Sequence, residues 1–261
     1  MENGLNNEKI TAILAKDKGS EANLQCWEVK DLEEKGYNYT CAVKIINVSY
    51  VMGNQQLQTS YFFKFKDSSA IDPLTKNMIS YVFKKESFFY FEFLPKLNII
   101  LAKCNQKELN VPNALGFNLE LGKEFLILKN LKSCGFKPFD RLKYLDVGHT
   151  TLILQEFARL HATSIILHYQ QHNEDWLSKF PQLDNPFEAC EGLRVFYNTF
   201  FGFTEGVADV ASEMDSFKNA SDWIINLLSN IYERWVQDLN QNFQFLAACH
   251  GDGWVNNLMF K

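Results

Sequence analysis

The hydrophobic pattern of this chain changes at Leu131, and that change most restricts the folds open to it. Before Leu131, segments rich in β-branched and aromatic residues predict four strands, at residues 38–50, 57–66, 114–117 and 125–128. The turn-forming pair Gly53-Asn54 separates the first two, so we expect them to be antiparallel. Between the strand pairs, residues 76–94 have helical spacing of apolar residues, and Pro95 is expected to end that helix.

After Leu131 the pattern is mainly helical. Residues 150–168 predict a core helix whose inward face carries Leu154, Phe157, Ala158, His161 and Ile165. Ser221 is expected to cap a second helix that extends to Leu239. The stretch between the two helices, residues 175–203, is expected to be rich in loops.

The length and this order of elements predict two lobes. At 261 residues the chain exceeds the usual size of one compact domain, so one large unit or two closely packed lobes are the options. We expect an N-terminal lobe at residues 1–131, with an antiparallel sheet and one helix, and a helical C-terminal lobe at residues 132–261. Separate runs of strands and helices indicate the α+β class.

The composition argues against nucleic acid and membrane partners. The formal net charge is −5, so no broad basic surface is expected. The polar N-terminus has no apolar leader segment, and no apolar run reaches the roughly 18 residues that span a bilayer. The six cysteines include no CxxC pair, which favours reduced thiols. We therefore expect a cytoplasmic protein.

Residues 250–261, HGDGWVNNLMFK, contain the strongest chemical signal. They follow a strand-like run at residues 243–249, so the HGD segment is expected at the end of a strand. Asn257 follows Asp252 by five positions. At this spacing, kinase catalytic loops carry a base that accepts the proton of the substrate hydroxyl and an amide that binds magnesium. The alternative is that Asp252 caps a turn and Asn257 is an ordinary loop residue.

Phosphoryl transfer also requires positive charge at the nucleotide phosphates, which a strand lysine held by a helical glutamate provides in kinases. Lys64 lies among phenylalanines in SYFFKFK, where an ammonium requires an anionic partner. Glu86 falls within the apolar stripe of the helix at residues 76–94 and is the expected partner. The alternatives are a purely structural pair, Lys66 as the inward lysine, or Lys44 on the preceding strand.

The segment KGYNYTCAV is a candidate phosphate loop. Backbone amides and polar side chains at Asn38, Tyr39 and Thr40 could close over phosphates. The segment has a single glycine, Gly36, and no GxGxxG pattern, so an ordinary hairpin turn is the alternative.

Six segments in order resemble the ecdysteroid kinase-like family of insects, also labelled CHK kinase-like, within the choline and aminoglycoside kinase-like group. They are GYNYT, FFKFK, VFKKESFFY, LKNLKSCGF, LQEFARLHATS and CHGDGWVNNLMF, and the resemblance covers the chain from about Leu32 to Lys261. The last segment is the most specific. The resemblance implies a two-lobed protein-kinase-like fold, ATP with Mg²⁺ as donor, and a small lipophilic acceptor that bears a hydroxyl, such as an ecdysteroid or a foreign compound.

The resemblance also implies roles for individual residues. Lys64 would bind the phosphates of ATP, and Glu86 would orient Lys64. Asp252 would be the catalytic base, and Asn257 would be a ligand of Mg²⁺. The segment from Leu128 to Leu131 would be the adenine hinge, binding through backbone groups of residues that include Lys129, Asn130 and Leu131.

This chain departs from the family pattern in three places. The family favours an acidic pair where the chain has Lys129-Asn130, and a serine where it has Cys41. The family's second magnesium aspartate, in a DFQ-like motif, would lie beyond Lys261, as would much of the acceptor pocket. The resemblance therefore implies a truncated C-terminal lobe and little or no activity for this chain.

The residues allow one alternative function and argue against another. A non-catalytic kinase-like protein would bind a nucleotide, a lipophilic ligand or a partner without turnover. A metal hydrolase that uses His250 and Asp252 would require a second cluster of histidines, which the sequence lacks.

Overall fold

The computed structural model describes most of the chain, namely residues 4–32, 41–66, 72–170, 176–184, 189–228, 230–239 and 246–261. The chain forms two compact units. The first consists of residues 1–69, 82–173 and 247–261, and the second of residues 70–81 and 174–246. Every predicted site residue that is described belongs to the first unit. The division into lobes at residue 131 stays a prediction.

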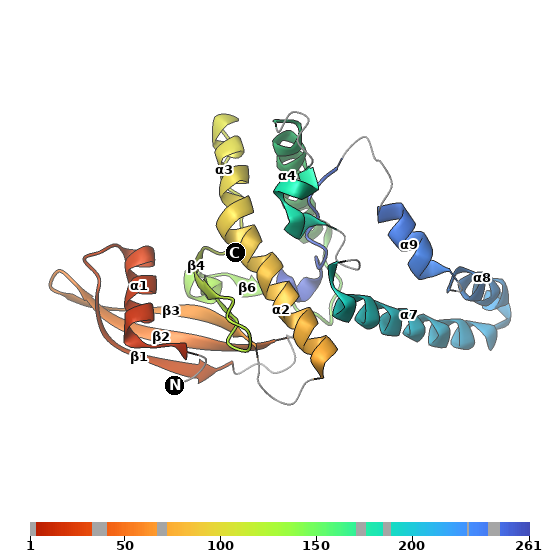
Figure 1. Cartoon of the computed structure of the whole chain (residues 1–261), viewed down its shortest axis with the longest axis horizontal. Coiled ribbons are helices and arrows are strands. Elements are labelled where there is room, and N and C mark those ends of the chain that lie inside the picture. Colours follow the sequence, from red (N-terminus) through yellow and green to blue (C-terminus); the bar gives the residue numbers. More distant parts are fainter. Residues whose placement is uncertain are drawn as a thin grey trace. The chain divides into compact units, whose positions relative to one another are not determined.

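The first unit contains a five-stranded antiparallel sheet (Figure 1). Its strands lie in the order β1 (Asn23–Asp31), β2 (Ala42–Met52), β3 (Gln55–Phe65), β5 (Phe125–Lys129) and β4 (Ala114–Asn118). The turn between β2 and β3 contains Gly53 with a φ of 58°, which glycine adopts without a steric penalty. Both predicted strand pairs are confirmed, except for residues 38–40, which lie outside the described residues.

Helix α1 (Asn7–Lys18) and strand β1 were not expected from the sequence. The side chain of Asn6 caps α1 by accepting a hydrogen bond from Lys9 N at 2.9 Å. The buried side chains of α1 are those of Ile10, Ile13 and Leu14. These apolar positions are few in a polar segment, so the helical pattern in the sequence is weak.

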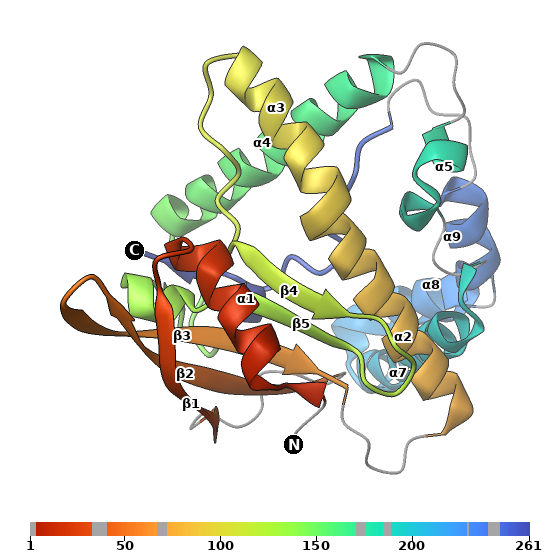
Figure 2. The ribbon, with the colours of Figure 1, turned by 60° about the vertical axis from the view of Figure 1, so that its left-hand side comes forward.

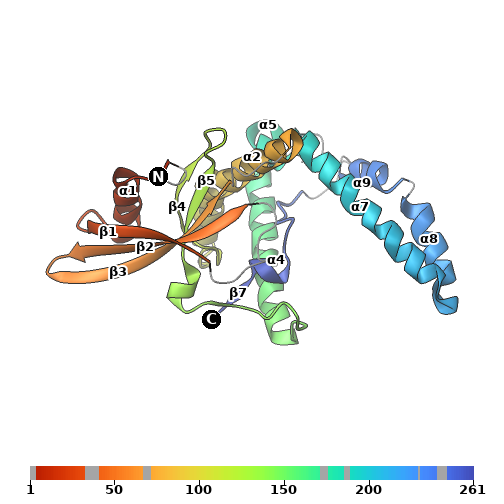
Figure 3. The ribbon, with the colours of Figure 1, turned by 90° about the horizontal axis from the view of Figure 1, so that it is seen from below.

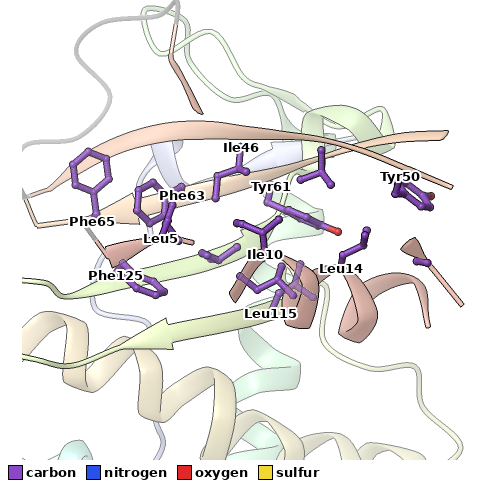
Figure 4. Close-up of a cluster of buried hydrophobic side chains, with 14 residues drawn as sticks. Leu5, Ile10, Leu14, Ile46, Tyr50, Tyr61, Phe63, Phe65, Leu115 and Phe125 are labelled. Carbon is purple, nitrogen blue, oxygen red and sulfur yellow. The ribbon is translucent and has the colours of Figure 1, made fainter. Parts of the chain in front are cut away.

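The core of this unit lies between α1 and one face of the sheet (Figure 2). Alternate residues of the strands point into it, because every second side chain of a strand shares a face. We call this group the core cluster; Figure 4 labels Leu5, Ile10, Leu14, Ile46, Tyr50, Tyr61, Phe63, Phe65, Leu115 and Phe125. Lys64 and Leu126 are direct partners across β3 and β5 and lie on the opposite face.

The helix that carries Glu86 does not end at Pro95, contrary to expectation. Helix α2 (Pro73–Phe88) continues through a π-helical turn, η2 (Phe89–Phe93), into α3 (Leu94–Lys103), and Figure 2 shows the continuous ribbon. Inside an α-helix the proline ring would collide with the carbonyl four residues earlier. The wider π-helical turn lies directly before Pro95, which then occupies the first turn of α3, where a missing N–H is tolerated.

A two-stranded sheet and one long helix complete the first unit. Strand β6 (Lys137–Pro138), which follows the short helix η3 (Leu131–Cys134), pairs with β7 (Met259–Phe260). Helix α4 (Val147–Gln170) is seen with β7 in Figure 3. Its buried residues are Leu160, Thr163, Ser164 and Leu167. Of the predicted inward face, Phe157, His161 and Ile165 are half-buried, whereas Ala158 is exposed and Leu154 is 60% exposed. The buried face of α4 is rotated by about one residue from the predicted face. The reason is that α4 packs against α3 and the segment before His250.

The second unit is helical in its described part. Its elements are α5 (Trp176–Lys179), η4 (Pro181–Leu183), α7 (Glu191–Ser212), η5 (Asp215–Phe217), α8 (Lys218–Leu228) and α9 (Ile231–Leu239). The loop expected at residues 175–203 is wrong from Glu191 onward, where α7 begins. Ser221 is not a cap but lies inside α8, and its buried hydroxyl donates to Ala208 O at 2.7 Å. No helix in the described parts of the chain is long and apolar enough to cross a bilayer.

Candidate active site

Lys64 and Glu86 form an ion pair, as the sequence predicted. Lys64 leaves β3 on the face away from the core cluster, because its neighbours Phe63 and Phe65 point into that cluster. Lys64 Nζ donates a hydrogen bond to Glu86 Oε2 at 2.6 Å. The two side chains are 18% and 24% exposed, so the pair is largely shielded from water. The pairing is confirmed, and its role towards a nucleotide stays a proposal.

The two rival lysines have other acidic partners. Lys66 Nζ lies 3.4 Å from Glu124 Oε1 in a buried pair whose side chains are 5% and 2% exposed. Lys44 Nζ lies 3.3 Å from Asp31 Oδ1. The strand register therefore brings Lys64, rather than either rival, to the glutamate of α2.

Lys64 is held in its charged form. Burial disfavours the ammonium, but the charges of Glu86, Cys41 and Asp252 act in the other direction, together with the hydrogen bond to Glu86. The net result is that the pKa of Lys64 rises above its ordinary value. The contribution of Asp252 is the smallest of these, and both residues belong to the first unit.

Asp252 and Asn257 contact each other directly. Asn257 Nδ2 donates to Asp252 Oδ2 at 2.8 Å and to Asp252 O at 2.9 Å. The short helix η6 (Val255–Asn257) turns the chain back, so that Asn257 reaches Asp252. Within it, Asn257 N donates to Trp254 O at 2.9 Å. In the described part of the chain, no backbone N–H donates to the Asp252 carboxylate. The carboxylate therefore does not cap a turn among the described residues. The spacing of five residues thus places the two polar groups together.

The segment that leads into the HGD loop is not a strand, contrary to expectation. Residues 246–249 have no regular structure, and residues 243–245 lie outside the described residues. The segment is held by α4 instead: Ala248 N donates to Ser164 Oγ at 2.9 Å, and Ser164 Oγ donates to His161 O at 2.8 Å. Sequence reasoning missed Ser164. The available signal was a serine within a predicted core helix, because a buried hydroxyl requires partners.

Phe157 of α4 supports the loop from a second position. A Cβ atom at Gly253 would lie 2.6 Å from Phe157 Cζ, so the ring and the backbone fit only because residue 253 is glycine. The Phe157 ring centroid also lies 6.0 Å from that of His250 and 6.4 Å from that of His161. Helix α4 therefore contacts the segment on both sides of His250.

The predicted hinge is held by internal contacts at its start. Lys129 N donates to Asn113 O at 2.8 Å at the end of β5. Asn130 Nδ2 donates to Ser60 Oγ at 2.9 Å, and Asn130 Oδ1 accepts from Lys132 N at 3.1 Å and caps η3. Leu131 O accepts from Phe136 N at 3.1 Å. The side chain of Asn130 is thus used within the protein, as are the Lys129 N–H and the carbonyls of Asn130 and Leu131, and adenine recognition through backbone groups stays a proposal.

The donor atoms at Asp252 and Asn257 suit part of a magnesium site. Among the residues that the structure describes, no three His, Cys, Asp or Glu side chains gather as metal ligands. Mg²⁺ usually keeps several waters and binds one or two carboxylates together with substrate phosphates. Because Asn257 turns its Nδ2 towards Asp252, its amide oxygen and one Asp252 carboxylate oxygen remain as candidate ligands. The predicted phosphate-loop residues Asn38, Tyr39 and Thr40 lie outside the described residues.

Comparison with known proteins gives one match. The model of the ecdysteroid kinase-like family matches residues 35–261, which include Lys64, Glu86, Asp252 and Asn257. No curated protein and no solved structure matches the chain. Helix α1 and strand β1 precede the matched residues. Because the match covers well over half of the sequence, the chain belongs to the ecdysteroid kinase-like family.

Proposed function

We propose that this chain carries the nucleotide site and catalytic loop of a small-molecule kinase. The reaction is transfer of the terminal phosphoryl group of ATP to a hydroxyl of a small lipophilic acceptor, such as an ecdysteroid-like or foreign compound. The observation that supports the proposal is that one unit contains both a lysine–glutamate pair at 2.6 Å and an Asp252–Asn257 pair at 2.8 Å, the two pairs that kinases use for the nucleotide and the catalytic loop.

Lys64 and Glu86 serve the donor. The ammonium of Lys64 binds phosphate oxygens of ATP, and Glu86 keeps it in place through the 2.6 Å hydrogen bond. Because the raised pKa of Lys64 keeps it protonated, the site offers the same positive charge throughout the physiological pH range. In this proposal Asn38, Tyr39 and Thr40 supply further phosphate contacts, and backbone groups of residues 129–131 bind the adenine.

Asp252 serves the acceptor. Its carboxylate accepts the proton of the acceptor hydroxyl as the oxygen attacks the terminal phosphorus of ATP and the bond from that phosphorus to ADP breaks. Asn257 orients Asp252 through two hydrogen bonds. When bound at Asn257 and the nucleotide, Mg²⁺ supplies positive charge that offsets the negative charge of the phosphates.

Nucleotide binding without turnover is the second candidate function. The observation that favours it concerns carboxylates: kinases hold magnesium with an aspartate as well as the loop asparagine, and among the described residues Asp252, the proposed base, is the carboxylate that contacts Asn257. Loss of one principal metal ligand can cost several orders of magnitude in the rate of phosphoryl transfer. On this view the chain binds ATP, or a lipophilic ligand, as a pseudokinase.

One experiment separates the two candidates. Purified residues 1–261 are incubated with labelled ATP, Mg²⁺ and a panel of ecdysteroids and hydroxylated foreign compounds, and ATP binding is measured by calorimetry. The matched control is Asp252→Asn, which keeps the size of the side chain and removes the base. Turnover above this control supports the kinase. Binding without turnover supports the pseudokinase, and absence of both overturns both proposals.

A further inference from the structure

Helix α1 precedes the residues matched by the family model, yet it packs onto the sheet that leads to the hinge. Ile10 and Leu14 have no exposed surface, and Ile13 is 5% exposed. A Cβ atom at Gly116 of β4 would lie 3.4 Å from Ile13 Cγ1, so helix α1 and strand β4 pack in van der Waals contact at this point. Helix α1 is therefore an integral layer of the first unit.

Asp17 lies in the last turn of α1 and is a buried carboxylate, with a side chain 4% exposed. Its Oδ2 accepts a hydrogen bond from the Tyr61 hydroxyl at 3.2 Å and lies 3.1 Å from Lys18 Nζ. Its Oδ1 lies 3.7 Å from Lys129 Nζ. A buried carboxylate is tolerated only when cations and hydrogen-bond donors compensate it. Asp17 therefore depends on partners from two strands as well as from its own helix.

Tyr61 and Lys129 are direct partners across β3 and β5. Directly opposed residues place their side chains on the same face of a sheet. That face is the one covered by α1, because Tyr61 belongs to the core cluster (Figure 4). Lys64 lies on the other face. Asp17 thus contacts both strands from the core side while Lys64 is presented to the candidate site.

Lys129 is also the last residue of β5 and lies within the predicted hinge, Leu128 to Leu131. A change in the direction of the strand end would move the backbone groups of residues 129–131 together. Misplacement of a binding group by about 1 Å can cost roughly 10²-fold in function. The contact between Asp17 and Lys129 therefore lies at the end of β5, where a small movement of the backbone would change the binding of a ligand held by backbone groups.

We propose that Asp17 is a positioning residue for the nucleotide site. By holding Tyr61 and Lys129, it fixes the end of β5 from which the hinge departs, so helix α1 sets the affinity for an adenine nucleotide. The inference rests on the proposed function for its assignment of residues 128–131 as the hinge. It adds a residue outside the family match to the determinants of nucleotide binding.

The test uses the whole chain and four variants. Asp17→Asn removes the charge but keeps an acceptor for the Tyr61 hydroxyl, and Lys129→Met removes the other half of the pair. The double variant completes a thermodynamic cycle. Lys18→Met is the matched control, because Lys18 contacts the same carboxylate but does not belong to the strand. The measurements are the Kd of a fluorescent ATP analogue with Mg²⁺, the unfolding midpoint, and hydrogen exchange of amides 125–131.

We expect Asp17→Asn and Lys129→Met each to weaken binding of the analogue by roughly 5- to 20-fold, a range typical of coupling between sites. The double variant should be no weaker than the worse single variant, and Lys18→Met should stay within about twofold. Exchange of amides 125–131 should accelerate in both single variants. Multiplicative losses in the double variant, or an equal loss in Lys18→Met, would overturn the proposal.

Failure of this inference is distinguishable from failure of the proposed function. If the unmodified chain does not bind the analogue, the nucleotide role is wrong for the whole site, and exchange at amides 125–131 still reports whether Asp17 holds the strand end. If the chain binds the analogue and Asp17→Asn lowers only the unfolding midpoint, Asp17 is structural and the inference alone is wrong.

Discussion

Asn257 donates hydrogen bonds to both the carboxylate and the backbone carbonyl of Asp252, at 2.8 and 2.9 Å. The amide therefore fixes the rotamer of Asp252 and turns its own oxygen away from it. On the proposed function, a loop arranged in this way would require little rearrangement to act on a bound nucleotide.

Replacement of Asn257 by alanine should abolish the magnesium dependence of ATP binding. The variant loses a candidate metal ligand and both hydrogen bonds to Asp252. We expect Mg²⁺ to tighten ATP binding at least about tenfold in the unmodified chain and less than about twofold in Asn257→Ala. Calorimetry with Mg²⁺ and with EDTA measures this ratio. Asn256→Ala is the control, because the amide atoms of Asn256 are buried without a hydrogen-bond partner in the described part of the chain. An unchanged ratio in Asn257→Ala would contradict the assignment.

Replacement of Lys64 by methionine should weaken both binding and folding. Loss of the ammonium removes a phosphate contact and leaves Glu86 shielded and unpaired. We expect ATP binding to weaken at least about tenfold and the free energy of unfolding to fall by about 1–3 kcal/mol. Adding Glu86→Gln should restore part of the stability and none of the binding. Lys30→Met removes an exposed ion pair with Glu28 and should change neither quantity measurably. Full ATP affinity in Lys64→Met would disprove the role of this lysine.

The stability contributed by the Lys64 pair should be constant up to high pH. Burial opposes the ammonium, but the charges of Glu86, Cys41 and Asp252 raise its pKa above the ordinary 10.5. A group whose pKa is raised by folding stabilises the folded state fully below its unfolded pKa, and this stabilisation is lost as the pH rises through the folded pKa. Urea unfolding of the unmodified chain and Lys64→Met should therefore differ equally at about pH 7 and pH 9, and the difference should shrink only above about pH 10.5. A decline already visible at about pH 9 would argue against a raised pKa.

Removal of the Ser164 hydroxyl should loosen the segment before the HGD loop. In Ser164→Ala the N–H of Ala248 loses its acceptor, which should cost about 1–3 kcal/mol of unfolding free energy and accelerate hydrogen exchange at Ala248. Thr163→Val is a matched control, because the Thr163 hydroxyl is buried next to it but donates to Arg159 O within α4 at 2.6 Å. Exchange at Ala248 should not change in the control. Equal exchange in the two variants would show that Ser164 does not hold the loop.

The features predicted well from the sequence are those set by local patterns. The β2–β3 hairpin follows from alternation and Gly53, and the strand register then determines which lysine faces α2. Glu86 could be identified because a carboxylate in an apolar helical stripe requires a partner. The spacing of Asp252 and Asn257 indicated that they act together, and the two side chains do contact each other, while their roles stay proposals.

The features that were missed depend on contacts between distant parts of the chain. Helix α1 has few apolar residues and is stabilised by the sheet that it covers. Ser164 acts through Ala248, a partner that no local pattern reveals. Pro95 was interpreted as a helix end because propensity disfavours proline inside a helix, but the π-helical turn and the buried packing of Leu97 and Ile100 sustain the helix through it.

The π-helical turn at residues 89–93 also sets the rotation of helix α2 about the helix axis relative to helix α3. Each residue of an α-helix advances the rotation by about 100°. Insertion or deletion of one residue in the turn would therefore rotate the side chains of α2 relative to those of α3. Helix α3 is fixed by its buried side chains at Leu97 and Ile100. Deletion of one residue in the turn would therefore rotate Glu86 away from Lys64 even though every atom of the pair is retained. Alignment of the ion pair thus depends on the number of residues in this turn as well as on their identity.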